Sequence, residues 1–151
     1  MYEKILVAID GSSTSLRGLD EALRLVKATG GSLLLVHVVN ELVVVGDYAP
    51  ASYYESFIES MRESGTKVLA EAAARVRRAD VPHEQKLIET LGGRTADEIV
   101  REAKQWPADL IVLGTHGRRG LKRLAMGSDA EMVLRLAPVP VLMVRDEPES
   151  P

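Results

Sequence analysis

Ile5-Leu-Val-Ala-Ile9-Asp-Gly-Ser-Ser13 begins with an unbroken run of apolar residues and ends with small polar ones. A continuous apolar run is typical of a strand that is covered on both faces, as in a parallel sheet. Asp, Gly and Ser favour tight turns and the first positions of helices. The stretch therefore predicts a strand that leads directly into a helix, which is the repeating unit of an α/β fold.

The same order of strand and helix recurs along the rest of the chain. Apolar residues three and four positions apart predict a helix over 15–29, which Gly30-Gly31 ends, and the apolar run 33–39 predicts a second buried strand. Residues 40–54 have no clean period and predict a loop or lid. The remaining pattern predicts helices over 55–79, 94–105 and 128–136, and strands over 83–89, 109–113 and 141–144.

Strands that alternate with helices in this way predict one domain with a doubly wound, five-stranded, mainly parallel sheet. Right-handed crossovers leave two main strand orders, 2-1-3-4-5 and 3-2-1-4-5, and periodicity does not choose between them. In the second order the first and fourth strands are neighbours. The loops after Asp10 and Gly114 would then meet at the switch point where such sheets bind ligands.

Composition excludes several classes of function. The 151 residues suit a single core, and the absence of cysteine removes thiol catalysis, thiolate metal sites and disulfides. A formal net charge of -3 does not favour a nucleic-acid partner. No apolar run approaches the roughly 20 residues of a membrane helix, and the first residues lack the pattern of a secretory signal. We therefore expect a cytoplasmic protein without membrane or nucleic-acid partners.

A glycine-rich segment follows the fourth strand. Gly114-Thr-His-Gly117 is followed by nine residues and then by Gly127-Ser128 at the start of a helix. Glycines allow close approach of the backbone, and free amides at a helix start donate to phosphate oxygens. The segment also carries basic residues and no acid, which indicates an anionic ligand; these are Arg118, Arg119, Lys122 and Arg123. The alternative is a tight turn with a solvated basic loop and an ordinary Ser cap.

Several segments, taken together in this order, resemble the universal stress protein family. They are Ile5 to Ser12, Leu35-Val-His-Val38, the glycine pattern from Gly114 to Ser128, and Ala137-Pro-Val-Pro-Val-Leu-Met-Val144. The spacing Gly-x2-Gly-x9-Gly-Ser is similar to that of the ATP-binding subgroup. The resemblance implies the strand order 3-2-1-4-5, an adenine nucleotide alpha hydrolase-like fold and a domain over residues 1–145. We expect the acidic segment 146–151 to be a disordered tail.

The resemblance also implies a site for ATP with Mg²⁺ as its companion. In it Asp10 faces the ribose or phosphates, Val38 offers backbone groups to adenine, and Gly127 and Ser128 close over the outer phosphates. Asp10 has an alternative interpretation, in which it only orders the turn before the first helix. The full set of site residues that the resemblance implies is Ala8, Ile9, Asp10, Val38, Leu113, Gly114, Gly117, Arg118, Gly127, Ser128 and Asp129.

Asp129 departs from the pattern of many relatives, which have an apolar residue at this position. An acid in the first turn of a helix is favoured by the helix dipole, but it repels a γ-phosphate unless a metal ion or Arg118 intervenes. Asp129 therefore either points away from the site or assists a metal. Among the histidines, His37 is interpreted as a hydrogen-bonded core residue, and His116 has no definable catalytic partner. No residue is assigned a catalytic role.

The final strand predicts a partner. Val139 to Val144 contains no charge and would promote aggregation as an open sheet edge. Pairing with its copy across a two-fold axis would cover it, and the family resemblance implies the same homodimer. The function that the resemblance implies is an ATP-binding, nucleotide-dependent regulator or sensor in a stress response. The alternatives are a slow ATP hydrolase of the same fold and a nucleotide-free dimeric interaction protein.

Overall fold

Strands and helices alternate along the chain in the computed structural model, which describes residues 1–41, 50–115 and 126–146. The alternation that the sequence predicts is confirmed in these ranges. The elements are β1 (Lys4–Ala8), α1 (Ser13–Thr29), β2 (Ser32–Asn40), α2 (Ala51–Arg78), β3 (His83–Thr90), α3 (Thr95–Gln105), β4 (Leu110–Gly114), α4 (Ser128–Leu136) and β5 (Val141–Val144).

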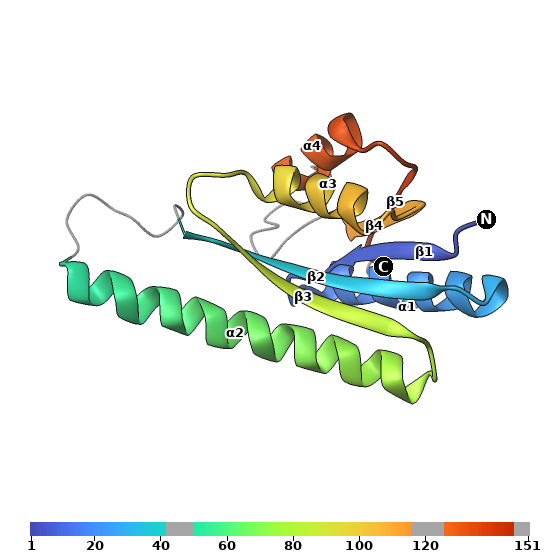
Figure 1. Ribbon diagram of the computed structural model, residues 1–151, viewed down its shortest axis with the longest axis horizontal. Coiled ribbons are helices and arrows are strands. Elements are labelled where there is room, and N and C mark those ends of the chain that lie inside the picture. Colours follow the sequence, from blue (N-terminus) through green and yellow to red (C-terminus); the bar gives the residue numbers. More distant parts are fainter. Residues whose placement is uncertain (42–49, 116–125, 147–151) are drawn as a thin grey trace, which may run out of the picture.

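The five strands form one parallel sheet in the order β3-β2-β1-β4-β5 (Figure 1). This confirms the predicted fold class and decides between the two strand orders that periodicity left open. Strands β1 and β4 are hydrogen-bonded neighbours, with Val7 opposite Val112. The switch point therefore lies where these two strands end, as the second order requires.

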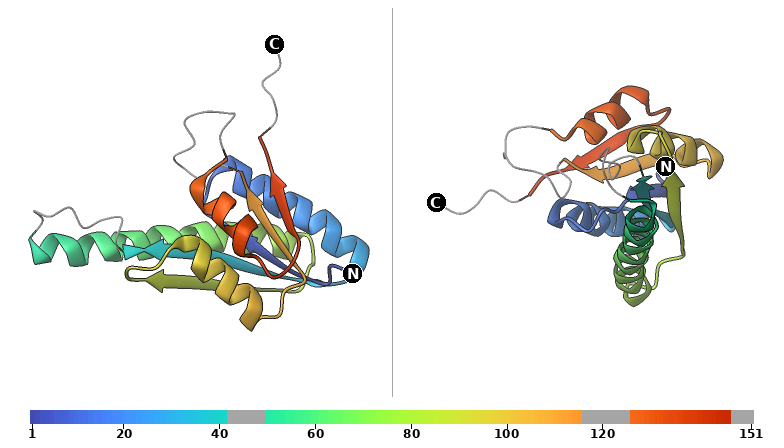
Figure 2. Two further views of the ribbon diagram at one scale, coloured as in Figure 1. Left: turned by 90° about the horizontal axis from the view of Figure 1, so that it is seen from above. Right: turned by 90° about the vertical axis from the view of Figure 1, so that its left-hand side faces the viewer.

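Helices cover both faces of the sheet, α1 and α2 on one side and α3 and α4 on the other (Figure 2). Successive side chains of a strand point to opposite faces, so each central strand contributes to two cores. In β1, Ile5 and Val7 pack against α1 and α2, whereas Leu6 packs in the core beneath α3 and α4. This double burial explains why the central strands are apolar without alternation.

Helix α1 begins two residues before the predicted start, because Ser12 caps it. The Ser12 hydroxyl accepts a hydrogen bond from the amide of Ser15, which satisfies one of the free amides at the helix start. At the other end, Gly30 adopts a left-handed conformation with φ of 77° and donates its amide to the carbonyl of Val26. The predicted stop at Gly30 is confirmed.

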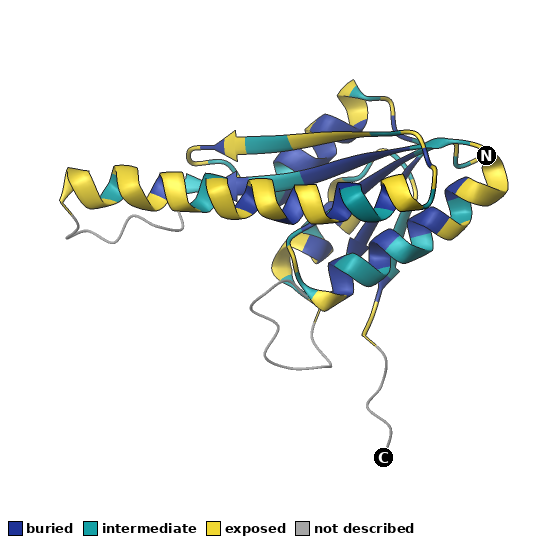
Figure 3. Ribbon diagram, turned by 90° about the horizontal axis from the view of Figure 1, so that it is seen from below, coloured by how far each residue is buried: buried dark blue, intermediate teal, exposed yellow. Residues whose placement is uncertain are grey.

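The predicted loop over 40–54 is wrong for its last residues, since α2 already begins at Ala51. The first turns of this helix bury almost nothing: Tyr53 is 69% exposed, Phe57 is 49% exposed, and the first buried side chain is Ile58 (Figure 3). A helix that lies in solvent needs no apolar period, so the sequence gives no sign of it. Tyr48, also assigned to the loop, lies outside the described residues.

The last described residues lie against the start of α1. The Ser13 hydroxyl donates to Asp146, the first residue of the expected tail, at 3.0 Å from Oδ1. Residues 147–151 lie outside the described ranges. None of the helices described has the length and apolar character needed to cross a membrane.

Helix α2 approaches the sheet closely at Gly65. A Cβ atom at this position would lie 2.7 Å from Cδ2 of His37 and 2.8 Å from Cδ1 of Leu87. We expect Gly65→Ala to lower the free energy of unfolding by about 1–3 kcal/mol, because the sheet side chains must move. This loss should exceed the gain of about 1 kcal/mol that Ala has over Gly in a helix. Urea unfolding measures the difference.

Gly18 in α1 supplies the matched control, since the nearest atom to a Cβ there is Cγ1 of Val112 at 3.5 Å. Gly18→Ala should leave the free energy of unfolding unchanged or raise it by up to about 1 kcal/mol. Equal effects of the two substitutions would contradict the close approach at Gly65.

Candidate functional site

The carboxyl ends of β1 and β4 bring five of the eleven predicted site residues together. Strand β1 ends at Ala8 and is followed by Ile9 and Asp10, while the neighbouring β4 ends with Leu113 and Gly114. These five residues come from parts of the chain that are about a hundred positions apart. The structure thus brings one group of predicted residues to a single edge of the sheet.

Asp10 has a structural role in the turn before α1. Its Oδ1 atom accepts hydrogen bonds from the amide of Ser12 at 2.8 Å and from the hydroxyl of Ser12 at 2.5 Å. Ser12 in turn caps the helix. The alternative interpretation, in which Asp10 orders this turn, is therefore confirmed as one role of the residue. The side chain is half-buried at the edge of the sheet.

Gly114 is required by packing, because α1 passes very close to it. A Cβ atom on Gly114 would lie 2.5 Å from the Thr14 hydroxyl oxygen and 2.8 Å from the Thr14 carbonyl carbon. The side chain of Leu113 is 5% exposed and belongs to the core beneath α3 and α4. Since neither side chain is available, these two residues can offer only backbone groups to a ligand.

Helix α4 points its first turn at the same edge. The amide of Gly127 donates to the carbonyl of Thr115 at 2.8 Å, which ties the helix start to the end of β4, and α4 begins at Ser128 as predicted. Gly127 is the capping residue and has no side chain to accept from the first-turn amides. The start of α4 therefore retains amide donors and the positive end of the helix dipole.

Asp129 lies in this first turn and is exposed. Desolvation by the surrounding protein, and then the negative charge of Asp10, raise the pKa of the Asp129 carboxyl group above its ordinary value. Two carboxylates from opposite sides of the edge thus repel each other. A proton or a cation bound near them would relieve the repulsion.

Thr115 was not singled out by the sequence, although it follows Gly114 directly. It is 7% exposed, and its buried hydroxyl oxygen has no hydrogen-bond partner within the described ranges. Its amide donates to Val144 and its carbonyl accepts from Gly127, so only the side chain is unsatisfied. A buried hydroxyl without a partner is costly, and one beside a helix start can serve a bound anion or water.

Val38 lies on β2 beyond the end of β1, since the last pair of the β1–β2 ladder joins Ala8 and Val36. The preceding residue, His37, is partly buried, and its Nδ1 atom lies 2.7 Å from the carbonyl oxygen of Ile9. The predicted hydrogen bond of His37 is confirmed, but the prediction that the residue belongs to the core is wrong, because it is only partly buried.

The basic part of the glycine-rich segment lies outside the described residues. This applies to the predicted site residues Gly117 and Arg118, and to His116, Arg119, Lys122 and Arg123. In residues 1–41, 50–115 and 126–146, no three His, Asp or Glu side chains are grouped to hold a metal ion.

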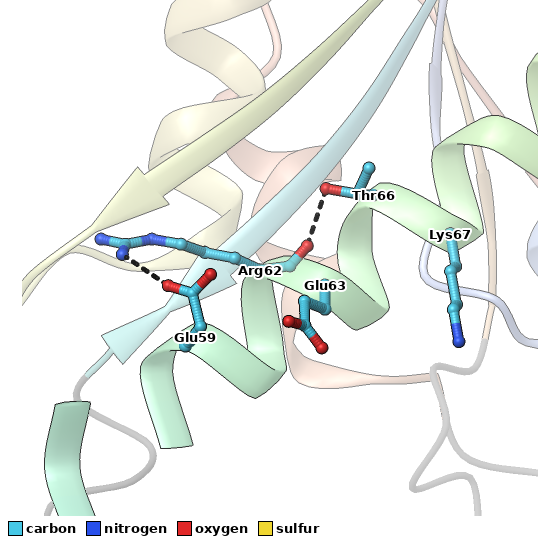
Figure 4. A pocket seen from close by; sticks show the side chains of 5 residues that line it. All are labelled: Glu59, Arg62, Glu63, Thr66 and Lys67. Atoms are coloured by element: carbon cyan, nitrogen blue, oxygen red, sulfur yellow. Dashed lines mark hydrogen bonds and ion pairs between the residues drawn. The ribbon is translucent and has the colours of Figure 1, made fainter. Parts of the chain in front are cut away.

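A surface depression lies elsewhere, along α2. Arg62 pairs with Glu89 of β3 at 2.6 Å. It also pairs with Glu59 at 3.5 Å (Figure 4). The lining residues of the depression come from one helix: Glu59, Arg62, Glu63, Thr66 and Lys67. Because Arg62 already pairs with carboxylates and no strand end contributes to the lining, we locate the candidate site at the edge of β1 and β4.

Comparisons of this chain with known proteins agree on one family. The model of the universal stress protein family matches residues 1–145. Universal stress protein YxiE of Bacillus subtilis is 34% identical over 151 residues, which cover 96% of this chain and 100% of that protein. A crystal structure of a family member from Burkholderia pseudomallei is 36% identical, with a TM-score of 0.76 over 95% of this chain and 96% of the other.

Two similar structures contain adenine nucleotides. The universal stress protein of Archaeoglobus fulgidus in complex with dAMP is 26% identical, with a TM-score of 0.66 over 95% of this chain and 98% of the other. A universal stress protein in complex with cAMP is 25% identical, with a TM-score of 0.69 over 95% of this chain and 97% of the other.

The raised pKa of Asp129 predicts how stability depends on pH. A carboxyl group whose pKa is raised by folding stabilises the folded state at low pH, and this contribution is lost as the pH rises through the raised pKa. We expect Asp129→Asn to be more stable than the wild type at pH 7, with the advantage shrinking to nothing by about pH 3, below the ordinary pKa of about 4. Urea unfolding at several pH values measures this difference.

Glu131→Gln controls for the loss of one negative charge from the same turn. Glu131 pairs with Arg135 at 3.5 Å, so its replacement should not stabilise the protein at pH 7. An Asp129→Asn variant that is no more stable than the wild type at neutral pH would contradict the repulsion.

Proposed function

Because this chain belongs to the universal stress protein family, we propose that it binds ATP together with Mg²⁺ at the carboxyl edge of β1 and β4. The observation that carries the proposal is the start of α4, where amide donors without a side-chain cap lie beside the buried hydroxyl of Thr115. The dAMP and cAMP of the two related structures support an adenine nucleotide as the ligand.

The proposal assigns the nucleotide from base to phosphate along this edge. The backbone of Val38 holds adenine, and Asp10 accepts from the ribose through the carboxylate oxygen that the Ser12 turn does not use. Ala8 and Ile9 border the nucleotide, and the backbone of Leu113 and Gly114 lies along the ribose and first phosphates. Gly117 and Arg118, outside the described residues, complete the phosphate contacts.

The outer phosphates fit the donors at the start of α4. Phosphate oxygens accept from free amides at a helix N-terminus, and the Ser128 hydroxyl is exposed there. The hydroxyl of Thr115 would gain the partner that it lacks within the described part of the chain. Gly127, without a side chain, leaves room for the phosphates to approach.

The charge of the edge is less favourable to ATP alone. Asp10 and Asp129 already repel each other, and a triphosphate would add several negative charges to the same region. Mg²⁺ prefers carboxylate and phosphate oxygens and would neutralise part of this charge when bound. We therefore propose Mg-ATP as the ligand, in agreement with the alternative in which Asp129 assists a metal.

We further propose that the protein is a homodimer joined through Val139 to Val144. Strand β5 is one edge of the sheet, and its first three residues are half-buried and uncharged. The exposed apolar side chains of Leu134 and Leu136 lie on α4, which packs beside this strand. Pairing with a second copy would satisfy the free edge and cover apolar surface.

The biological role that this combination supports is regulation in the cytoplasm during stress, through nucleotide-dependent association. We propose nucleotide binding, rather than hydrolysis, as the activity. Release of ADP or AMP by the purified protein would move the proposal to the slow hydrolase.

Binding of Mg-ATP is tested first by stability. At a concentration of about 100 times Kd, a ligand adds about 2.7 kcal/mol to the free energy of unfolding, which corresponds to a rise in Tm of roughly 5–10 °C. We expect this shift with Mg-ATP and a smaller one with ATP in EDTA. No shift at millimolar Mg-ATP would contradict the proposed function.

Gly127→Val should abolish the shift because it fills the space above the first turn of α4. The fold should survive, since φ of −60° and ψ of 148° at this position suit valine. Ala137→Val at the other end of α4 is the control, with φ of −62° and ψ of 132°. If both variants bind Mg-ATP as the wild type does, the phosphates do not lie at the start of α4.

The dimer is tested by removing one outward amide of β5. The carbonyls of Pro140 and Val144 accept from β4, so the backbone groups of Val141 and Met143 point to the free edge. Met143→Pro removes a free-edge donor without breaking the ladder to β4. We expect a wild-type mass near twice 16.5 kDa by light scattering and a monomer for Met143→Pro.

Met143→Ala keeps the amide and shortens the same side chain, so it should remain a dimer. A dimer that tolerates Met143→Pro would contradict association through this strand.

A further inference from the structure

The hydrogen-bond ladder between β1 and β2 ends one bond earlier than its geometry would allow. The amide of Ile9 donates to the carbonyl of Val36 at 2.8 Å, which continues the parallel pattern past the last paired residue, Ala8. In a regular parallel ladder, the next bond would run from the amide of Val38 to the carbonyl of Ile9. The assigned pairing nevertheless ends at Ala8 and Val36.

The imidazole of His37 forms a hydrogen bond with the carbonyl of Ile9, which the amide of Val38 would use in a regular ladder. Nδ1 of His37 lies 2.7 Å from the carbonyl oxygen of Ile9. A carbonyl oxygen only accepts, so Nδ1 carries the hydrogen and donates it. The hydrogen bond to this carbonyl therefore comes from a side chain of β2, where a regular ladder would have a backbone amide.

The replacement leaves the backbone of Val38 directed at the edge of the site. Backbone groups of residues two apart in a strand point the same way, so the amide and carbonyl of Val38 point to the same side as those of Val36. On that side β1 has ended, and Val38 is partly exposed. Figure 1 shows β2 continuing past the end of β1.

We propose that His37 is a positioning residue: by taking the carbonyl of Ile9, it ends the β1–β2 ladder and keeps the amide and carbonyl of Val38 available to read the edge of an adenine base. This inference rests on the proposed function. Adenine offers an acceptor at N1 beside a donor at N6, which matches an amide and a carbonyl of one residue. Guanine offers the reverse pair and is rejected.

The position of the ring is fixed from the other side by α2. Gly65 packs against it so closely that a Cβ atom would lie 2.7 Å from Cδ2 and 3.1 Å from Nε2. The ring therefore lies between the helix and the end of β1. This packing limits how far the ring can move away from Ile9.

The test compares His37→Leu, which removes the donor, with His37→Asn, which keeps a donor near the position of Nδ1. Amide exchange is measured first, without nucleotide. We expect the Val38 amide to exchange at least about tenfold faster than that of Val36 in the wild type and in His37→Asn. In His37→Leu, Val38 should become protected as its amide bonds to Ile9. Where leucine prevents folding beside Gly65, His37→Ala removes the same donor.

Nucleotide affinity is measured next on the same proteins. His37→Leu should bind Mg-ATP about 10-fold more weakly, the effect of about one lost hydrogen bond, and should lose preference for ATP over GTP. Inorganic tripolyphosphate, which has no base, should bind wild type and variant equally. His37→Asn should restore affinity for Mg-ATP to within about threefold. If His37→Leu only lowered the stability of the protein, its affinities for Mg-ATP and for tripolyphosphate would fall together.

Two results separate this inference from the proposed function. If the wild type binds Mg-ATP, and His37→Leu binds it equally well with unchanged exchange at Val38, the role of His37 is overturned and the nucleotide site stands. If the wild type binds no adenine nucleotide at all, the proposed function fails, and with it the recognition of adenine by Val38.

Discussion

The unequal lengths of the neighbouring strands β1 and β2 determine which backbone groups this protein can offer to a ligand. Strand β1 ends at Ala8, whereas β2 continues to Asn40, so part of the backbone of β2 has no partner strand on one side. Such backbone must find other donors and acceptors. Just after β1, the imidazole of His37 donates to the carbonyl of Ile9. We propose that a purine base pairs with the amide and carbonyl of Val38 on β2. The backbone of these strands, rather than any side chain, thus sets the position of the candidate site.

Two carboxylates at the same edge oppose the anion binding that the backbone amides favour. The start of α4 attracts an anion through its amides and dipole, while Asp10 and Asp129 repel one and repel each other. Asp10 is retained because it orders the turn that leads into α1 through Ser12. A divalent cation would reconcile the two tendencies, and for this reason we propose the magnesium complex of ATP, rather than free ATP, as the ligand.

Much of the fold could be predicted from the sequence because the signals are local. Apolar runs identified the strands, glycine and proline identified their ends, and Gly30 and Ser128 marked helix boundaries that the structure confirms. The start of α2 could not be predicted, because helix that lies in solvent carries no apolar period. The orphan hydroxyl of Thr115 and the contact of Gly114 with Thr14 depend on segments distant in sequence, so no local pattern records them.

The candidate site was predicted in part by spacing and in part by resemblance. Strand alternation left two strand orders open, in one of which the ends of β1 and β4 are neighbours, and the structure has that order. The resemblance supplied Val38, which spacing alone does not distinguish from any other strand residue. Neither spacing nor resemblance predicted the hydrogen bond between His37 and Ile9, because this bond depends on where β1 ends relative to β2.

A crystal structure of the protein soaked in millimolar Mg-ATP tests the central claim most directly. The account predicts a purine ring against the backbone of Val38 and phosphates over the first turn of α4, beside Thr115. A nucleotide bound elsewhere, or an edge left empty with Asp10 and Asp129 unchanged, would contradict it.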